Sequence, residues 1–122
     1  MERLTNAEHE IMLYLWELER CTIRDIIAAT GDENLPHSTV SSVVRLLEKK
    51  GYVGHKAYGK TYEYFPLVKK SQYGKRTLSQ MLNDFFNNSP KALVSFLVNE
   101  KKLSAGELKA LAEELEKLKP ES

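Results

Sequence analysis

Residues 37–51 of the chain read HSTVSSVVRLLEKKG, and this stretch decides the fold. At about 100° per residue, one third of a helix circumference holds four apolar side chains: Val40, Val43, Val44 and Leu47. The opposite side carries hydroxyls and cations: Ser38, Ser42, Arg45 and Lys49, flanked by Thr39 and Ser41. Small hydroxyls with cations beyond them suit close approach to a polyanion and are a poor choice for a protein core.

Gly51 ends this helix, because glycine adopts a left-handed C-cap without strain. Two β-prone runs follow, residues 52–57 and 61–65, and the tip at 58–60 contains a glycine, so the sequence predicts a hairpin. A helix with a basic outer face followed by a basic hairpin is typical of a winged helix. There the helix enters the major groove and the hairpin reaches the neighbouring backbone, so we expect DNA binding.

Chain length, composition and cysteine count limit the classes of protein that the sequence can encode. A chain of 122 residues has room for one domain, or for one small domain and a dimerisation segment. The apolar content of 42% and charged content of 29% are those of an ordinary soluble protein. No apolar run is long enough to span a membrane and no signal peptide is recognisable. The single cysteine, Cys21, excludes an internal disulfide and fits a reducing compartment, so we expect a cytoplasmic protein.

Charge is distributed unevenly along the chain. Residues 37–76 hold nine lysines and arginines against two acidic residues, a net charge of +7. Residues 1–36 carry −5 and residues 77–122 carry −1. The positive block coincides with the proposed helix and wing, and it is the local field that steers a protein to phosphate.

Two helices are expected before the third. Thr5 and Glu8 form a capping box, and the helix that follows has an apolar stripe: Ala7, Ile11, Tyr14, Leu15 and Leu18. A shorter helix is expected to start at Thr22 and stop at Gly31. Three helices with short connections and then a hairpin predict a winged helix-turn-helix domain over residues 1–68.

Residues 69–122 are expected to form three further helices. Ser71 is expected to cap the first, Pro90 to begin the second, and Ser104 with Glu107 to open the last as a capping box. Their apolar stripes are read as the dimerisation surface: Leu78, Met81, Leu82, Phe85, Leu93, Phe96, Leu97, Leu108, Leu111, Leu115 and Leu118. A second copy of the chain would bury them and present two reading helices. The stripes could instead be intrachain core, or serve as both. The fold class is therefore mainly α with a small β-hairpin, a winged helix joined to a helical dimerisation domain.

The sequence resembles the penicillinase-repressor family of BlaI/MecI/CopY transcriptional regulators. The segments that carry the likeness run through nearly the whole chain: LTNAE at 4–8, IM at 11–12, LW at 15–16, TIRDI at 22–26, STV at 38–40, RLLEKKGYV at 45–53, YEYFP at 62–66, ALVSFL at 92–97 and LS at 103–104. The resemblance implies a homodimer that represses transcription from palindromic operators with TACA/TGTA-type half-sites.

The resemblance also bears on the inducing signal. In relatives that control β-lactam resistance, a membrane sensor metallopeptidase triggers cleavage of the repressor at an Asn-Phe bond, which lines up with Ser95-Phe96 here. Serine therefore replaces the asparagine of those relatives. The copper-responsive branch carries paired cysteines near its C-terminus and this chain has none there, so metal sensing is not expected.

The candidate DNA-contacting residues fall in two groups. On the third helix they are His37, Ser38, Thr39, Ser41, Ser42, Arg45 and Lys49. On the wing they are Lys56, Tyr58 and Lys60. The hydroxyls suit base edges or phosphates, and Arg45 and Lys49 suit phosphates. Ordinary solvated surface is the alternative for each, and it is the preferred interpretation of Lys69, Lys70, Lys75 and Arg76.

No catalytic or metal-binding pattern emerges. His9-Glu10 begins like a zinc-protease motif, but Leu13 stands where the second ligand should be. We therefore expect neither an enzyme nor a cofactor. The predicted function is that of a dimeric transcriptional repressor. One alternative is a winged-helix module that meets an acidic partner protein, and another is a regulator gated by a small molecule bound between wing and tail.

Overall fold

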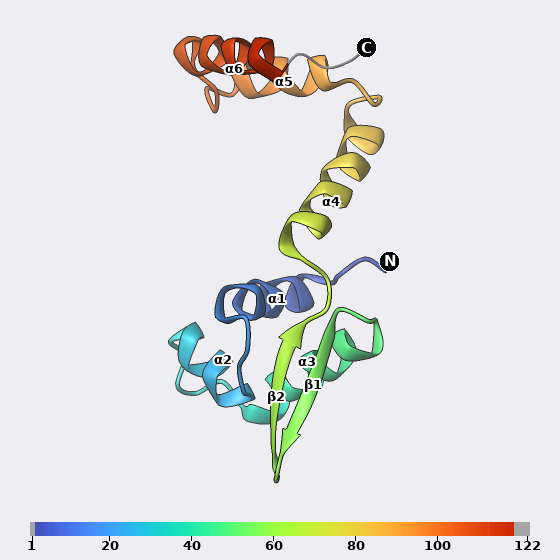
Figure 1. The fold of residues 1–122 in the computed structure, drawn as a ribbon, viewed down its shortest axis with the longest axis vertical. Coiled ribbons are helices and arrows are strands. Elements are labelled where there is room, and N and C mark those ends of the chain that lie inside the picture. Colours follow the sequence, from blue (N-terminus) through green and yellow to red (C-terminus); the bar gives the residue numbers. More distant parts are fainter. Residues whose placement is uncertain (1, 119–122) are drawn as a thin grey trace. The chain divides into compact units, whose positions relative to one another are not determined.

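The computed structural model describes residues 2–118, without the side chains of Leu115, Lys117 and Leu118. The elements in chain order are α1 (Asn6–Leu18), α2 (Ile23–Thr30), α3 (His37–Lys49), β1 (Val53–Tyr58), β2 (Thr61–Pro66), α4 (Lys70–Phe85), α5 (Pro90–Asn99) and α6 (Ala105–Leu118) (Figure 1). The chain divides into two compact units, Met1–Gly74 and Lys75–Ser122. The predicted class, mainly α with one small hairpin, is confirmed.

The first two helices begin where the sequence predicts, and both begin with a capping box, of which only the first was predicted. Thr5 Oγ1 accepts the Glu8 N–H at 3.2 Å, and the Glu8 carboxylate accepts the Thr5 N–H at 2.8 Å. Thr22 and Asp25 repeat the arrangement at the start of α2. Such a cap typically contributes about 1 kcal/mol by satisfying backbone donors that the helix itself leaves free. Gly31, with a φ of +76°, ends α2 as expected.

The end of α3 turns the chain into the hairpin. The Gly51 N–H donates to the Glu48 carbonyl and the Tyr52 N–H to the Leu47 carbonyl, both at 3.0 Å, which is a Schellman motif. Gly51 has a φ of +86°, a conformation that side chains resist. Tyr52 and Val53, immediately beyond, are buried in the core.

The wing is a two-stranded antiparallel sheet whose register runs from Val53 opposite Pro66 to Tyr58 opposite Thr61. Tyr58 was expected in the tip but belongs to β1, so the loop is only Gly59-Lys60. Gly59 has a φ of +64°, the conformation that a two-residue hairpin loop asks of its first position. Backbone hydrogen bonds between Cys21 and Tyr64, at 3.0 and 2.7 Å, fasten β2 to the connection between α1 and α2.

One hydrophobic cluster holds the first unit together. Its most deeply buried members come from all three helices and from the start of the wing: Met12, Leu15, Ile26, Val40, Val44, Leu47, Tyr52 and Val53. The expected stripe of α1 was partly wrong, because Ala7 and Leu18 are exposed while Glu8 and Met12 are buried. The buried face therefore steps through residues 8, 11, 12 and 15, the ideal helical spacing.

The last three helices have the expected starts, with one exception. Ser89 Oγ accepts the Ala92 N–H at 3.0 Å ahead of Pro90, and Ser104 and Glu107 form the predicted capping box. Ser71 was expected to cap α4 but lies inside it, since the helix begins at Lys70. Phe86 and Phe96 meet edge to face at 5.6 Å between ring centroids.

No described side chain between Lys75 and Glu116 is buried. Of the residues expected at a dimer surface, three are half-buried: Leu82, Leu93 and Leu97. Six are exposed: Leu78, Met81, Phe85, Phe96, Leu108 and Leu111. The last two, Leu115 and Leu118, lie outside the described side chains.

Candidate nucleic-acid interface

The outward side of α3 carries the residues expected to touch DNA. Val40, Val44 and Leu47 are buried, so the helix is oriented with its apolar face toward the core. The predicted contact residues His37, Ser38, Thr39, Ser42, Arg45 and Lys49 are all exposed. Ser41 differs from them, because its side chain is only 8% exposed. Its hydroxyl accepts a hydrogen bond from Arg45 Nη2 at 3.3 Å, one helical turn away.

The wing presents its predicted residues to solvent. Lys56, Tyr58 and Lys60 are exposed, and the Lys56 ammonium lies 5.4 Å from the centre of the Tyr58 ring. Also on the wing, His55 pairs with Glu48 of α3 and stacks on Tyr62 at 4.4 Å between centroids. The His55–Glu48 pair ties the hairpin to α3, and the ring contacts lie within the hairpin.

A polar groove of about 570 Å³ separates α3 from the wing. Its lining residues come from α2, α3 and β2 and from the connections beside them: Thr22, Ile23, Arg24, His37, Ser41, Arg45, Lys60, Thr61, Tyr62 and Tyr64. Three of these side chains are cations and none is a carboxylate, so the groove is a positively charged channel. Sequence reasoning missed Thr22, Arg24 and Tyr62. No local sequence signal marked Arg24, which lies in the first turn of α2 and is exposed.

A buried ion pair holds α1 against the end of α3. Lys50 Nζ lies 2.7 Å from Glu8 Oε1, and the Glu8 side chain is almost wholly buried. Burial raises the pKa of Glu8, but hydrogen bonds from Lys50 and Thr5 lower it more, so the net pKa is below the ordinary value. Lys50 also donates to the Arg3 carbonyl at 3.2 Å. Neighbouring lysines thus differ in role: Lys50 is structural and Lys49 faces solvent.

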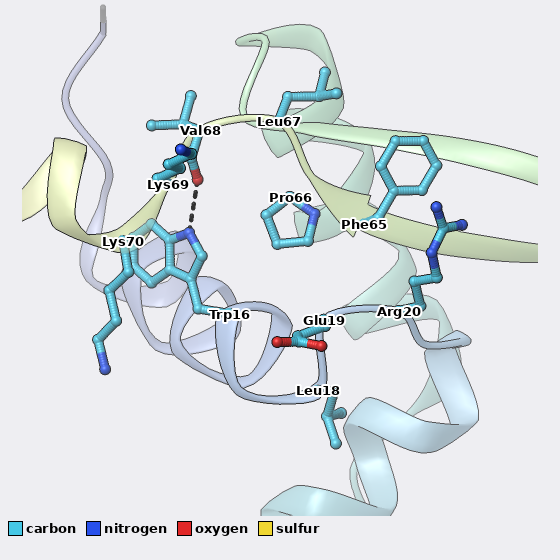
Figure 2. Close-up of a pocket in the computed structure, with 10 residues that line it drawn as sticks. All are labelled: Trp16, Leu18, Glu19, Arg20, Phe65, Pro66, Leu67, Val68, Lys69 and Lys70. Atoms are coloured by element: carbon cyan, nitrogen blue, oxygen red, sulfur yellow. Dashed lines mark hydrogen bonds between the residues drawn. The ribbon is translucent and has the colours of Figure 1, made fainter.

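The wing root, residues 65–68, is attached to α1 beside a second hollow of about 620 Å³ (Figure 2). Trp16 Nε1 donates to the Val68 carbonyl at 2.8 Å, so this indole packs within its own chain. The Arg20 guanidinium lies 5.1 Å from the centre of the Phe65 ring and 3.4 Å from Glu63. Figure 2 shows Glu19 and Arg20 beside Pro66 and Phe65 at the rim of this hollow.

The remaining reactive groups form no site. Burial first, with Asp25 and Glu63 adding, raises the pKa of the Cys21 thiol to about 11, which keeps it protonated and unreactive. Within residues 2–118, no three His, Cys, Asp or Glu side chains gather as a metal site would require. Over the same residues no helix has the length and apolarity to cross a membrane.

Three packed helices, a two-stranded wing fixed against the third helix, and a basic channel between them define a winged helix-turn-helix protein. The chain belongs to the penicillinase repressor family, whose model matches residues 4–117. The resemblance drawn from the sequence is therefore confirmed.

Among curated relatives, the methicillin resistance regulatory protein MecI of Staphylococcus aureus is 25% identical over 115 residues, which cover 93% of this chain and 94% of that protein. The penicillinase repressor of Bacillus licheniformis is 25% identical over 118 residues, 96% of this chain and 92% of that protein.

Solved structures show the same fold. The solution structure of the DNA-binding domain of the repressor BlaI matches with a TM-score of 0.50 and 23% identity, over 60% of this chain and 94% of that domain. A crystal structure of a mutant MarR from E. coli, complexed with operator DNA, matches with a TM-score of 0.50 and 13% identity, over 96% of this chain and 76% of that one. At these identities the likeness concerns the fold alone.

Proposed function

We propose that the protein is a homodimeric transcriptional repressor that binds palindromic operator DNA through α3 and the wing. The observation that carries this proposal is the outward face of α3, where exposed hydroxyls and the cations Arg45 and Lys49 continue into a positively charged groove. Such a surface matches phosphate and base edges together. The names of the relatives, a penicillinase repressor and a methicillin resistance regulator, support repression.

The exposed apolar residues of the tail support dimerisation. Exposed apolar residues recur along α4, α5 and α6, with Phe85 at 73% exposure. Two copies paired about a two-fold axis would cover these stripes and would place the two α3 helices in major grooves on one side of the duplex. Half-site centres separated by about 10–10.5 base pairs, or multiples of that, are the geometric consequence. Repression then needs no catalysis, only exclusion of polymerase from the promoter.

Relief of repression by proteolysis is the second part of the proposal. Ser95 and Phe96 are both exposed on α5, and Phe96 also packs on Phe86. Cleavage between them would divide the tail and separate the two DNA-binding units of the dimer. A membrane sensor metallopeptidase is the partner that this route requires. A gene for such an enzyme beside the gene for this protein would support it, and a repressor left intact during induction would end it.

The first test is a mobility-shift assay on the DNA upstream of the protein's own gene. Specific binding should weaken with salt, with a slope of roughly −0.9 in log K against log salt for each neutralised phosphate. The upstream fragment should bind more tightly than a random duplex of equal length. Equal affinity for both at every salt concentration would mean that the protein has no operator there.

A protein-interaction module is the competing function, in which the basic face of α3 meets an acidic protein. The groove contains Ser41 and Tyr62 hydroxyls as well as cations, which suits phosphate and bases better than carboxylate side chains alone. The same assay separates the two functions, because such a module would not distinguish duplex sequences.

A ligand-gated regulator is favoured by one observation, the hollow at the wing root in Figure 2, whose volume falls in the range of small-molecule sites. Its walls are Trp16, Phe65 and Pro66 among others. A thermal-shift screen of small metabolites tests this directly. A compound that stabilises wild type but not a Trp16→Ala variant of equal fold would establish it.

A further inference from the structure

The cations of the groove between α3 and the wing come from three separate parts of the first unit. Arg24 belongs to the first turn of α2, Arg45 to α3, and Lys60 to the loop of the wing. Within residues 2–118 none of the three forms an ion pair with a carboxylate. Unpaired cations held around one channel make it a binding surface for an anion that can reach all three.

The rest of the lining decides what kind of anion fits. Ile23, Ser41 and Tyr64 also line the groove and are buried, so the exposed members of the lining are the side chains that a bound group can contact most readily. Thr61 and Tyr62 add exposed hydroxyls from the wing. Hydroxyls and cations gathered in one groove are the usual partners of phosphate and sugar oxygens.

A hydrogen bond to the Ser41 hydroxyl orients the Arg45 side chain. It accepts from Arg45 Nη2 at 3.3 Å, and both residues line the groove. This bond draws the guanidinium toward the channel and away from the free side of the helix. The exposed hydroxyls of Ser38, Thr39 and Ser42 lie outside the groove lining and remain for contacts to base edges.

We propose that this groove holds a stretch of sugar–phosphate backbone, gripped by Arg24, Arg45 and Lys60, while sequence is read by Ser38, Thr39 and Ser42. Ser41 is then a positioning residue that acts through Arg45. The proposal rests on the proposed DNA-binding function and deepens it in two ways. It adds a residue of α2 to the interface, and it divides the α3 residues into backbone-binding and base-reading sets.

Arg24→Gln is the decisive variant, because the side chain is exposed and the variant should fold normally. We expect it to weaken operator and random duplex by the same factor and to reduce the magnitude of the salt slope by about 0.9, the loss of one phosphate contact. Arg20→Gln is the matched control. It removes the same charge from the same unit, at a residue that pairs with Glu63 outside the groove, and its slope should equal that of wild type.

Ser42→Ala tests the base-reading set. It should weaken operator binding and leave both the random-duplex affinity and the salt slope of wild type unchanged. A Ser41→Ala variant should instead resemble Arg24→Gln, with a smaller loss on both duplexes. Equal thermal melting of all four variants and wild type secures the comparison.

Titration with inorganic phosphate distinguishes a backbone groove from a site for a free anion. No stabilisation of wild type at millimolar phosphate, at constant ionic strength, is expected. Saturable stabilisation that Arg24→Gln abolishes would assign the groove to a small anion and overturn the proposal.

An Arg24→Gln salt slope equal to that of wild type would also overturn it, as would a loss confined to the operator. Failure of the wider function has a different signature, since wild type would then not prefer the operator at all.

Discussion

The two units of the chain differ in how they bury their apolar residues. In Met1–Gly74 the side chains of Leu15, Ile26 and Val44 have no exposed surface, and a single cluster joins all three helices to the wing. In the described part of Lys75–Ser122 no side chain is buried, and Leu111 remains 46% exposed. The first unit has a closed hydrophobic core of its own, whereas the described part of the second unit has no buried side chain.

Energetics support the same distinction. Burying one large aliphatic or aromatic side chain contributes about 1.5–3 kcal/mol. The tail has several such side chains on the surface, so association of two tails would recover stability that a single tail lacks. Stability gained by association depends on protein concentration, and stability of a preformed core does not. That difference is measurable.

Ile26→Ala and Leu111→Ala give the largest contrast. The first empties space in a closed core and should lower the free energy of unfolding by about 2–5 kcal/mol at every protein concentration. The second removes part of the proposed dimer surface, so the variant should need a higher protein concentration than wild type to reach the same melting temperature. Denaturation at two concentrations roughly a hundredfold apart measures both effects. A melting temperature of the tail that does not change with protein concentration would mean that the tail has a core of its own.

Truncation before Pro90 tests whether the tail links the two DNA-binding units of the proposed dimer. Residues 1–89 should sediment as a monomer and bind the operator about a hundredfold more weakly, because the second DNA-binding unit loses its effective-concentration advantage. The core of the first unit should melt as in the whole chain. If the truncated form sediments as a dimer, the interface lies elsewhere.

Glu8→Gln probes the ion pair that closes the first unit. Glutamine can still serve the cap, so the variant isolates the lost charge. We expect a loss of about 1.5–3 kcal/mol near neutral pH, the range for a hydrogen bond to a charged group.

The pH dependence of Glu8 has a defined sign. Its pKa is lowered in the folded protein, so the wild-type advantage is full above the ordinary carboxyl pKa and disappears as pH falls through the lowered pKa. Chemical denaturation across the acid range should show wild type and variant converging. An advantage that persists undiminished in strong acid would contradict the assignment.

Glu19→Gly should have the smallest effect, and a stabilising one. Glu19 has a φ of +66° and a ψ of −48°, and the Arg20 N–H donates to the Leu18 carbonyl at 2.7 Å, which makes a γ-turn with a conformation unfavourable for a side chain. Glycine relieves that strain at some cost in chain entropy, so a gain of up to about 1 kcal/mol is expected in thermal or chemical denaturation. Glu17→Gly, inside α1, is the matched control and should destabilise.

Local sequence signals predicted the first unit well where the structure depends on local chemistry. Thr5, Thr22 and Gly51 identified helix ends because each satisfies or permits a backbone conformation within a few residues. The register of the wing was predicted only approximately, since the assignment of Tyr58 to strand or turn depends on its partner Thr61.

What the sequence did not reveal depends on distant partners. Glu8 was not expected in the core because its burial needs Lys50, 42 residues further on. Arg24 was not expected at the interface because only the fold brings α2 beside the loop of the wing. Helical periodicity places Ser41 at the boundary between the apolar and polar faces of α3. Only the fold places it with Ile23 and Tyr64 in the groove lining.

The most direct test of the central claim reverses the charge of the exposed face of α3. An Arg45→Glu, Lys49→Glu double variant should keep the helix content and dimer mass of wild type, because both side chains are exposed. It should lose all specific binding in a mobility shift on the operator, since two phosphate-binding cations become repulsive. An unaltered mobility shift would show that DNA lies against some other face of the protein.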